Sequence, residues 1–130
     1  MSPEAARNEP VKDYAPGSPE RSEIKAQLAR MLAERIELPL VIGGENVRTG
    51  MLEPAIVPHD HAHVLADAHL AADKQIEEAI VAAQRAWPAW SRTPWPERAA
   101  IFLRAADLLA GPRRNVLNAA TMLGDRKSVV

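Results

Sequence analysis

The chain has no cysteine among its 130 residues. Disulfides, thiolate metal sites and thiol nucleophiles all require cysteine, so the sequence excludes each of them. It also lacks an excess of one charge, since 16 Lys and Arg against 17 Asp and Glu leave a net charge of −1, whereas an electrostatic nucleic-acid binder needs a basic excess. No apolar run reaches the roughly 18 residues of a membrane span, and the N-terminus has no apolar secretory core. We therefore expect a cytoplasmic protein with no nucleic-acid partner and no membrane partner.

Large apolar side chains are also scarce. Hydrophobic residues make up 47% of the chain, but 24 of them are alanine, which leaves a thin core for a small domain. No segment is long and apolar enough to be the central strand of a parallel sheet. Together these features predict that the chain is one part of a larger fold.

Turn and capping residues divide the chain. Prolines interrupt residues 1–17, which we expect to form an irregular arm. Ser18 is a good helix N-cap and Pro19 suits the first helical position, so a helix is predicted from there to about Glu34. Its apolar stripe is formed by Ile24, Leu28, Met31 and Leu32.

Three more helices are predicted in the second half. One starts near Asp73 and ends at Pro88, one is capped by Thr93 and stops at Gly111-Pro112, and the last follows that stop. Their expected inward faces consist of Ile76, Ala79, Ile80, Ala83 and Trp87; Ile101, Ala105, Leu108 and Leu109; and Val116, Leu117 and Ala120.

Short strands fill the middle of the chain. Residues 36–47 predict two strands joined by a tight turn at Gly43-Gly44. A second pair is predicted at 53–57 and 63–70, with residues 58–61 as the turn between them.

Several of these segments resemble the start of an aldehyde dehydrogenase. Residues 41–47 match the family's "I-G-G-x-x-V" strand pair, residues 76–83 with Trp90 match its Ala-rich helix ending in Trp, and residues 97–109 match its helix that begins "E-R-A" and ends "A-D-L-L". The resemblance implies an α/β aldehyde-dehydrogenase-like fold. This chain would supply only its N-terminal part, with about four helices, short antiparallel strands and no complete Rossmann sheet.

Four further stretches are similar to one branch of that family, the delta-1-pyrroline-5-carboxylate dehydrogenases, also called L-glutamate gamma-semialdehyde dehydrogenases. These stretches are residues 8–10, 14–21, 58–61 and 118–124. The resemblance covers roughly residues 8 to 124 and places residues 18–124 in the N-terminal part of the NAD-binding domain.

The branch implies an activity for the parent enzyme. A cysteine thiolate attacks the aldehyde, a hydride passes to NAD, and water then releases the acid, with a glutamate as base. The small-molecule aldehyde substrate would be L-glutamate gamma-semialdehyde, the product L-glutamate in proline degradation, and the parent enzyme a homo-oligomer.

The resemblance assigns no site residue to this chain. In the family, the nucleophilic cysteine, the base glutamate and the phosphate-binding turn all lie downstream of the segments matched here. Gly43-Gly44 does not lead from a parallel strand into a helix, so it is not a phosphate loop. The expected catalytic, cofactor-binding and metal-binding sets are therefore empty. We expect this chain alone to be inactive and not to bind NAD.

The C-terminal residues depart from the branch. After Gly124 the branch reads Gln-x-Lys-Thr, whereas residues 125–130 here read Asp-Arg-Lys-Ser-Val-Val. Those six residues are the translation of GAT-CGG-AAG-AGC-GTC-GTG, a common sequencing adapter. Our hypothesis is that residues 125–130 are non-native and that the parent protein is several times longer.

Three other patterns have a functional and a structural interpretation. His59, His61 and His63 alternate, with His69 nearby, which would place imidazoles about 7 Å apart on one strand face, as zinc or nickel could use. Solvated turn histidines are the alternative, and the resemblance favours it. A second pattern could stack on nucleic acid or simply pack at helix ends; it comprises Trp87, Trp90 and Trp95 with Arg85, Arg92 and Arg98. The stripe of the first helix could bind a partner or pack within the parent protein.

Two function hypotheses follow. The first is the N-terminal segment of the dehydrogenase. The second is a stand-alone helical protein-interaction module without catalysis. A cooperative unfolding transition of the 130 residues would favour the module.

Overall fold

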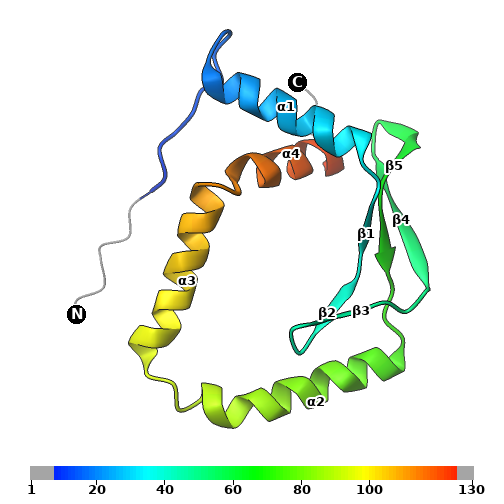
Figure 1. Ribbon diagram of the computed structural model, residues 1–130, viewed down its shortest axis with the longest axis vertical. Coiled ribbons are helices and arrows are strands. Elements are labelled where there is room, and N and C mark those ends of the chain that lie inside the picture. The colour runs from blue at the N-terminus through cyan, green and yellow to red at the C-terminus, as the bar shows by residue number, and fades with distance from the viewer. Residues whose placement is uncertain (1–7, 126–130) are drawn as a thin grey trace.

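The structure is a computed structural model that describes residues 8–125. Its elements, in chain order, are α1 (Pro19–Ala33), β1 (Ile36–Leu38), β2 (Leu40–Ile42), β3 (Glu45–Val47), β4 (Leu52–Val57), β5 (Asp60–His69), α2 (Asp73–Trp90), α3 (Trp95–Ala110) and α4 (Arg114–Gly124). Figure 1 shows them as an open frame, in which the strands form one side, α2 and α3 form two others, and α1 with α4 closes the fourth. Apart from Asp125, the expected non-native tail lies outside the described residues, as do the first seven residues of the arm.

The strands form two small sheets. In the first, β5 lies between β1 and β4; it pairs antiparallel with β4 and parallel with β1, with Ile36 opposite Ala66. In the second, β2 and β3 form the expected hairpin, and both glycines of its turn have positive φ, which glycine adopts without steric cost. Two strands were expected over 36–47 and all pairs antiparallel. Pro39 divides that segment, so β1 is free to pair in parallel with β5 while β2 enters the hairpin.

The first helix forms as predicted. The Ser18 hydroxyl accepts a hydrogen bond from the Arg21 amide at 3.3 Å, and Pro19 occupies the first turn, where its missing amide costs nothing. Ile24 is buried, Leu28 and Met31 are half-buried, and Leu32 is exposed. The predicted stripe is therefore packed only along its N-terminal part.

The predicted ends at the α2–α3 corner were wrong by one or two residues. α2 continues through Pro88 to Trp90, because the Ser91 amide donates to Trp87 O at 2.8 Å and closes the helix beyond the proline. Thr93 does not cap α3. Its hydroxyl donates to Ala89 O at the end of α2, so Pro94 takes the cap position and α3 starts at Trp95.

The α4 face was also predicted wrongly. Leu117 is 44% exposed, Ala120 is exposed and Val116 only half-buried, whereas Ala119 and Leu123 are buried. The face that packs is the one turned to α1, where Asn115 donates to Glu23 at 3.0 Å. Together with Ile24, Ala119 and Leu123 form the core between α1 and α4; a second buried group in the sheet consists of Val57, Ala66 and His69.

By contrast, α2 and α3 contain no buried residue. Their large apolar side chains are 38% to 68% exposed: Ile76, Ile80, Val81, Trp87, Trp90, Trp95, Ile101, Phe102, Leu103, Leu108 and Leu109. The expected stripes of these helices stay exposed, because β2 beside α2 and α4 beside α3 cover too little of them to bury a side chain. An exposed apolar surface of this extent is typical of a binding or packing face.

Candidate functional site

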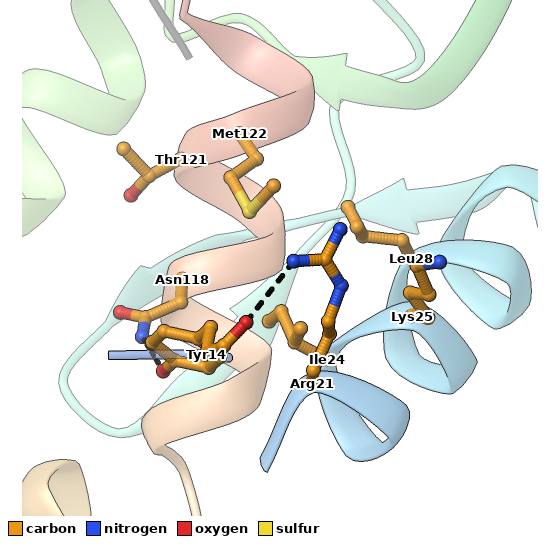
Figure 2. Close-up of a pocket in the computed structure, with 8 residues that line it drawn as sticks. All are labelled: Tyr14, Arg21, Ile24, Lys25, Leu28, Asn118, Thr121 and Met122. Carbon is orange, nitrogen blue, oxygen red and sulfur yellow. Dashed lines mark hydrogen bonds between the residues drawn. The ribbon is translucent and has the colours of Figure 1, made fainter. Parts of the chain in front are cut away.

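A pocket bordered by hydrogen-bonded polar side chains lies where the arm meets α1 and α4. The pocket has a volume of about 510 Å³. Figure 2 shows the side chains that line it: Tyr14, Arg21, Ile24, Lys25, Leu28, Asn118, Thr121 and Met122. One wall therefore comes from the arm, one from α1 and one from α4.

Tyr14 is fixed at the entrance by two hydrogen bonds. Arg21 Nη1 donates to the Tyr14 carbonyl at 3.1 Å, as drawn in Figure 2, and Asn118 Nδ2 donates to the Tyr14 hydroxyl at 3.0 Å. Tyr14 has φ 53°, and among the described residues it is the one non-glycine with positive φ. Such a backbone costs about 1–2 kcal/mol, so these contacts hold the arm in a strained conformation.

The arm is also attached nearer its start. Arg114 Nη1 donates to the Pro10 carbonyl at 2.8 Å, and Nη2 of the same guanidinium lies 3.8 Å from the Glu9 carboxylate. One arginine of α4 thus contacts two residues of the arm, and the α1–α4 core supports both attachment points.

The pocket combines an apolar surface with cationic side chains. Ile24, Leu28 and Met122 provide an apolar surface, and the cationic side chains of Arg21 and Lys25 border it. Its lining residues include no histidine, aspartate or glutamate, so the pocket presents neither an imidazole nor a carboxylate.

The four histidines are not brought together. His59 and His61 are exposed at the β4–β5 turn, where His61 Nε2 lies 3.0 Å from the Pro58 carbonyl, and His63 is half-buried. His69 lies at the opposite end of β5. Over residues 8–125 there is no group of three or more His, Cys, Asp or Glu side chains that could hold a metal ion.

His69 instead belongs to a second polar cluster, on one face of β1 and β5. Its Nε2 lies 2.7 Å from Glu37 Oε1, and Arg48 Nε donates to Glu37 Oε2 at 2.9 Å. These bonds, that of Arg48 first, lower the pKa of Glu37 below its usual value. Beside them, Arg35 donates to both oxygens of Asp67 at 2.6 Å, which lowers the pKa of Asp67 and raises that of Arg35.

The tryptophan and arginine pattern falls at the α2–α3 corner. The Arg98 guanidinium lies 5.9 Å from the ring centroid of Trp90, a cation–π distance, and all three tryptophans are exposed. The Arg98 guanidinium therefore contacts a tryptophan of the same chain. Residues 85–98, all of which the structure describes, form no row of stacked aromatic and basic side chains.

Sequence reasoning missed both polar clusters. Tyr14 and Asn118 are 104 positions apart, and Glu37 and His69 are 32 apart, so no local spacing connects them. The sequence offered one signal: residues 14–21 and 118–124 both carry the resemblance to the branch. The structure shows that Tyr14 and Asn118, one from each stretch, are in contact.

Comparison with known proteins assigns the chain to a family. The sequence profile of the aldehyde dehydrogenase family matches residues 48–127, more than half of its length. The chain belongs to the aldehyde dehydrogenase family. Within the part of the chain that the structure describes, no helix is long and apolar enough to span a membrane.

Its relatives in this family have a common name. The chain is 46% identical over 122 residues to the delta-1-pyrroline-5-carboxylate dehydrogenase of Agaricus bisporus, and 38% identical over 123 residues to the mitochondrial human protein of that name. These matches include 93% and 95% of this chain but 22% of each relative. The chain thus spans about a fifth of the length of the curated relatives.

Solved structures agree. The delta-pyrroline-5-carboxylate dehydrogenase of Mycobacterium tuberculosis, solved with NAD and cobalamin, superposes with a TM-score of 0.90 at 44% identity, over 95% of this chain and 23% of that one. The NAD-bound Thermus 1-pyrroline-5-carboxylate dehydrogenase gives a TM-score of 0.85 at 30% identity, over 95% of this chain and 24% of that one. The fold described above is therefore that of the matching segment in these aldehyde dehydrogenases.

Within residues 8–125 the structure contains no glycine-rich turn of the kind that binds a dinucleotide. Dinucleotide sites of α/β folds use a glycine-rich turn from a parallel strand into a helix. Here Gly43-Gly44 joins antiparallel strands, while β5 leads into α2 through Leu70, Ala71 and Ala72 without a glycine. The empty cofactor-binding and catalytic sets stay a prediction.

Proposed function

We propose that the chain is the N-terminal portion of an NAD-dependent delta-1-pyrroline-5-carboxylate dehydrogenase, which oxidises L-glutamate gamma-semialdehyde to L-glutamate in proline degradation. The observation that carries the proposal is similarity over almost the whole chain, up to 46% identity and a TM-score of 0.90, to proteins of that name. The resemblance in the arm and in α4 supports the branch as well as the family.

The role proposed for these residues is structural. In the whole enzyme the oxidation uses NAD as hydride acceptor and a cysteine nucleophile, and this chain has no cysteine. Its own residues fix the arm against α1 and α4, through Tyr14, Arg21 and Arg114, and present α2 and α3. The 130 residues alone are therefore proposed to be inactive and not to retain NAD.

The exposed helices indicate what the segment contacts. The apolar faces of α2 and α3 are proposed to pack against the remaining polypeptide of the parent enzyme, which we expect to be a homo-oligomer. No nucleic-acid partner and no membrane partner is proposed. We propose a cytoplasmic setting on the charge and composition of the chain; the human relative carries the word mitochondrial in its name.

A segment exchange tests the proposal. The matching segment of the Agaricus bisporus relative is replaced by residues 8–124 of this chain, giving a protein we call the chimera. We expect the chimera to reduce NAD with pyrroline-5-carboxylate within about tenfold of the unmodified relative, a loss of about 1.4 kcal/mol at most in transition-state stabilisation. The relative with the segment deleted, and the 130-residue chain alone, are the controls and should show no turnover.

Two results would contradict the proposal. One is a chimera that elutes as a folded protein but does not reduce NAD. The other is NAD reduction by the 130-residue chain alone, because that would require a catalytic group that we have not assigned.

The second candidate is the stand-alone interaction module, which the exposed apolar faces of α2 and α3 favour. A module must be stable by itself, whereas a segment of a larger domain needs its neighbours. The thermal unfolding experiment described in the Discussion therefore separates the two.

A further inference from the structure

His69 has both ring nitrogens engaged although it is nearly inaccessible. Its side chain is 3% exposed at the end of β5. The backbone amides of Thr49 and Gly50 approach Nδ1 at 3.0 and 3.1 Å, and Glu37 Oε1 lies 2.7 Å from Nε2. One imidazole thus connects β1, β5 and the turn formed by residues 48–50.

The partners of the ring determine where its proton lies. A backbone N–H can only donate, so Nδ1 must present its lone pair to Thr49 and Gly50. The single proton of the neutral ring then lies on Nε2 and is donated to the Glu37 carboxylate. This tautomer follows from the hydrogen-bond network alone.

A second proton would conflict with this arrangement. It can bind only at Nδ1, where it would point at two N–H groups. Among the described residues, the Thr49 and Gly50 amides have no other hydrogen-bond acceptor. A protonated His69 and an attached turn therefore exclude each other, since the Nδ1 proton would be a donor without an acceptor on a side chain that is 3% exposed.

We propose that His69 is a pH-dependent switch, whose neutral ring holds the 48–50 turn against β5 and whose protonation at Nδ1 releases that turn. The proposal does not depend on the proposed function.

The charged groups around the ring determine which side opens. Glu37 of β1 faces Nε2 and gains attraction when the ring is charged, so that bond persists. Arg48 of the turn already pairs with Glu37, while Arg35 and Asp67 on the same face pair with each other. The amide side is the one that separates.

The turn lies beside the junction that leads into α2. The Thr49 hydroxyl donates to Leu70 O at 2.8 Å, and the Leu70 amide donates to Met51 O at 2.8 Å. α2 begins at Asp73, three residues further on. Release of the 48–50 turn therefore leaves α2 with weaker support from the sheet.

The first test is spectroscopic and uses the full 130-residue chain, with the chimera measured in parallel. Imidazole nitrogen shifts of ¹⁵N-histidine-labelled protein should give the Nε2–H tautomer for His69 as long as the ring is neutral. As pH falls, the Thr49 and Gly50 amide signals should shift together with the ring. An Nδ1–H tautomer, or amides that do not follow the ring, would overturn the proposal.

A matched pair of variants separates the two sides of the ring. In His69→Asn the side-chain oxygen replaces Nδ1 as acceptor and cannot be protonated. In His69→Gln the amide nitrogen replaces Nε2 as donor, and the acceptor is lost. His61→Asn, at an exposed position, is the control.

The attachment of the turn is measured by hydrogen exchange of the peptide covering residues 48–52. The exchange rates are corrected for the intrinsic pH dependence of exchange. The original chain should lose protection by on the order of tenfold when His69 is protonated, because two amides lose their acceptor. His69→Asn should keep its protection at every pH, His69→Gln should lack it at every pH, and His61→Asn should behave as the original chain.

Two outcomes of the exchange experiment would refute the switch. One is pH-dependent protection that persists in His69→Asn. The other is loss of protection in residues 19–33 at the same pH, because the turn would then have no transition of its own.

Discussion

The corner formed by the arm, α1 and α4 differs sharply from the side formed by α2 and α3. The corner contains Ile24, Ala119 and Leu123 as buried core and fixes the arm with hydrogen bonds. The α2–α3 side has helices of normal length but no buried residue. Helix formation by local signals and helix stabilisation by packing are therefore separate events in this chain, and only the corner has both.

The largest expected effect is on the cooperative thermal unfolding of the whole chain. Heated alone, the 130-residue chain should show a weak or absent cooperative transition with aggregation, because the apolar α2–α3 faces and the outer strands are uncovered. In the chimera the same residues should unfold cooperatively. Circular dichroism with light scattering measures both, and a sharp reversible transition of the chain alone would favour the interaction module.

A pair of leucine substitutions tests the contrast within one protein. In the chain alone, Leu123→Ala should destabilise the corner by about 2–5 kcal/mol, whereas Leu108→Ala, which truncates a 46% exposed side chain, should cost less than about 1 kcal/mol. Hydrogen exchange of residues 19–33 and 95–110 in increasing urea provides the measurement.

The two leucine substitutions are also informative in the chimera. If the parent polypeptide covers α3, Leu108→Ala should there approach the cost of Leu123→Ala. Equal and small costs of Leu108→Ala in both proteins would mean that α3 stays uncovered.

A medium effect is expected where the arm meets α4. Arg114→Ala should free the arm near Glu9 and Pro10 and cost about 1–2 kcal/mol, since a charge-assisted hydrogen bond to Pro10 O is lost. Limited proteolysis should then cleave the arm faster. Arg104→Ala, on α3, is the control and should not change the cleavage rate; equal cleavage of both variants would contradict the arm attachment.

The smallest effect is the pH dependence of the exposed ion pairs. Glu37 and Asp67 both have a lowered pKa, chiefly through hydrogen bonds from Arg48 and Arg35. Their contribution to stability is therefore present above the unfolded-state range of about pH 4 and is lost as pH falls through the lower folded-state values. Because both ion pairs are accessible to solvent, added salt should also weaken this contribution to stability.

The Asp67→Asn variant isolates that contribution. In the chimera, its urea midpoint, followed in the sheet by hydrogen exchange of residues 60–69, should fall less between pH 6 and pH 3 than that of the chimera without the substitution. An unchanged pH slope would show that the Arg35–Asp67 pair does not stabilise the sheet.

The parts of the fold that the sequence predicted are those with a local cause. Ser18-Pro19 starts α1, Gly43-Gly44 turns the hairpin and Gly111-Pro112 ends α3, each through its own backbone chemistry. The error at Pro88 arises because the Ser91 amide closes α2 beyond the proline, and the error at Thr93 arises because its hydroxyl donates to Ala89 O instead of capping α3.

The parts that escaped prediction depend on distant partners. The parallel pairing of β1 joins residue 36 to residue 66, and the buried face of α4 is selected by α1 some ninety residues earlier. The same holds for the site: Tyr14 meets Asn118 where the arm lies against α4, and His69 meets Glu37 through the pairing of β5 with β1.

The position of the three tryptophans has a practical consequence. Trp87, Trp90 and Trp95 all lie at the α2–α3 corner, with Trp90 under the Arg98 guanidinium, while Tyr14, the one tyrosine, lies in the arm pocket. Intrinsic fluorescence excited at long wavelength will report the environment of the uncovered helices and remain blind to the α1–α4 core.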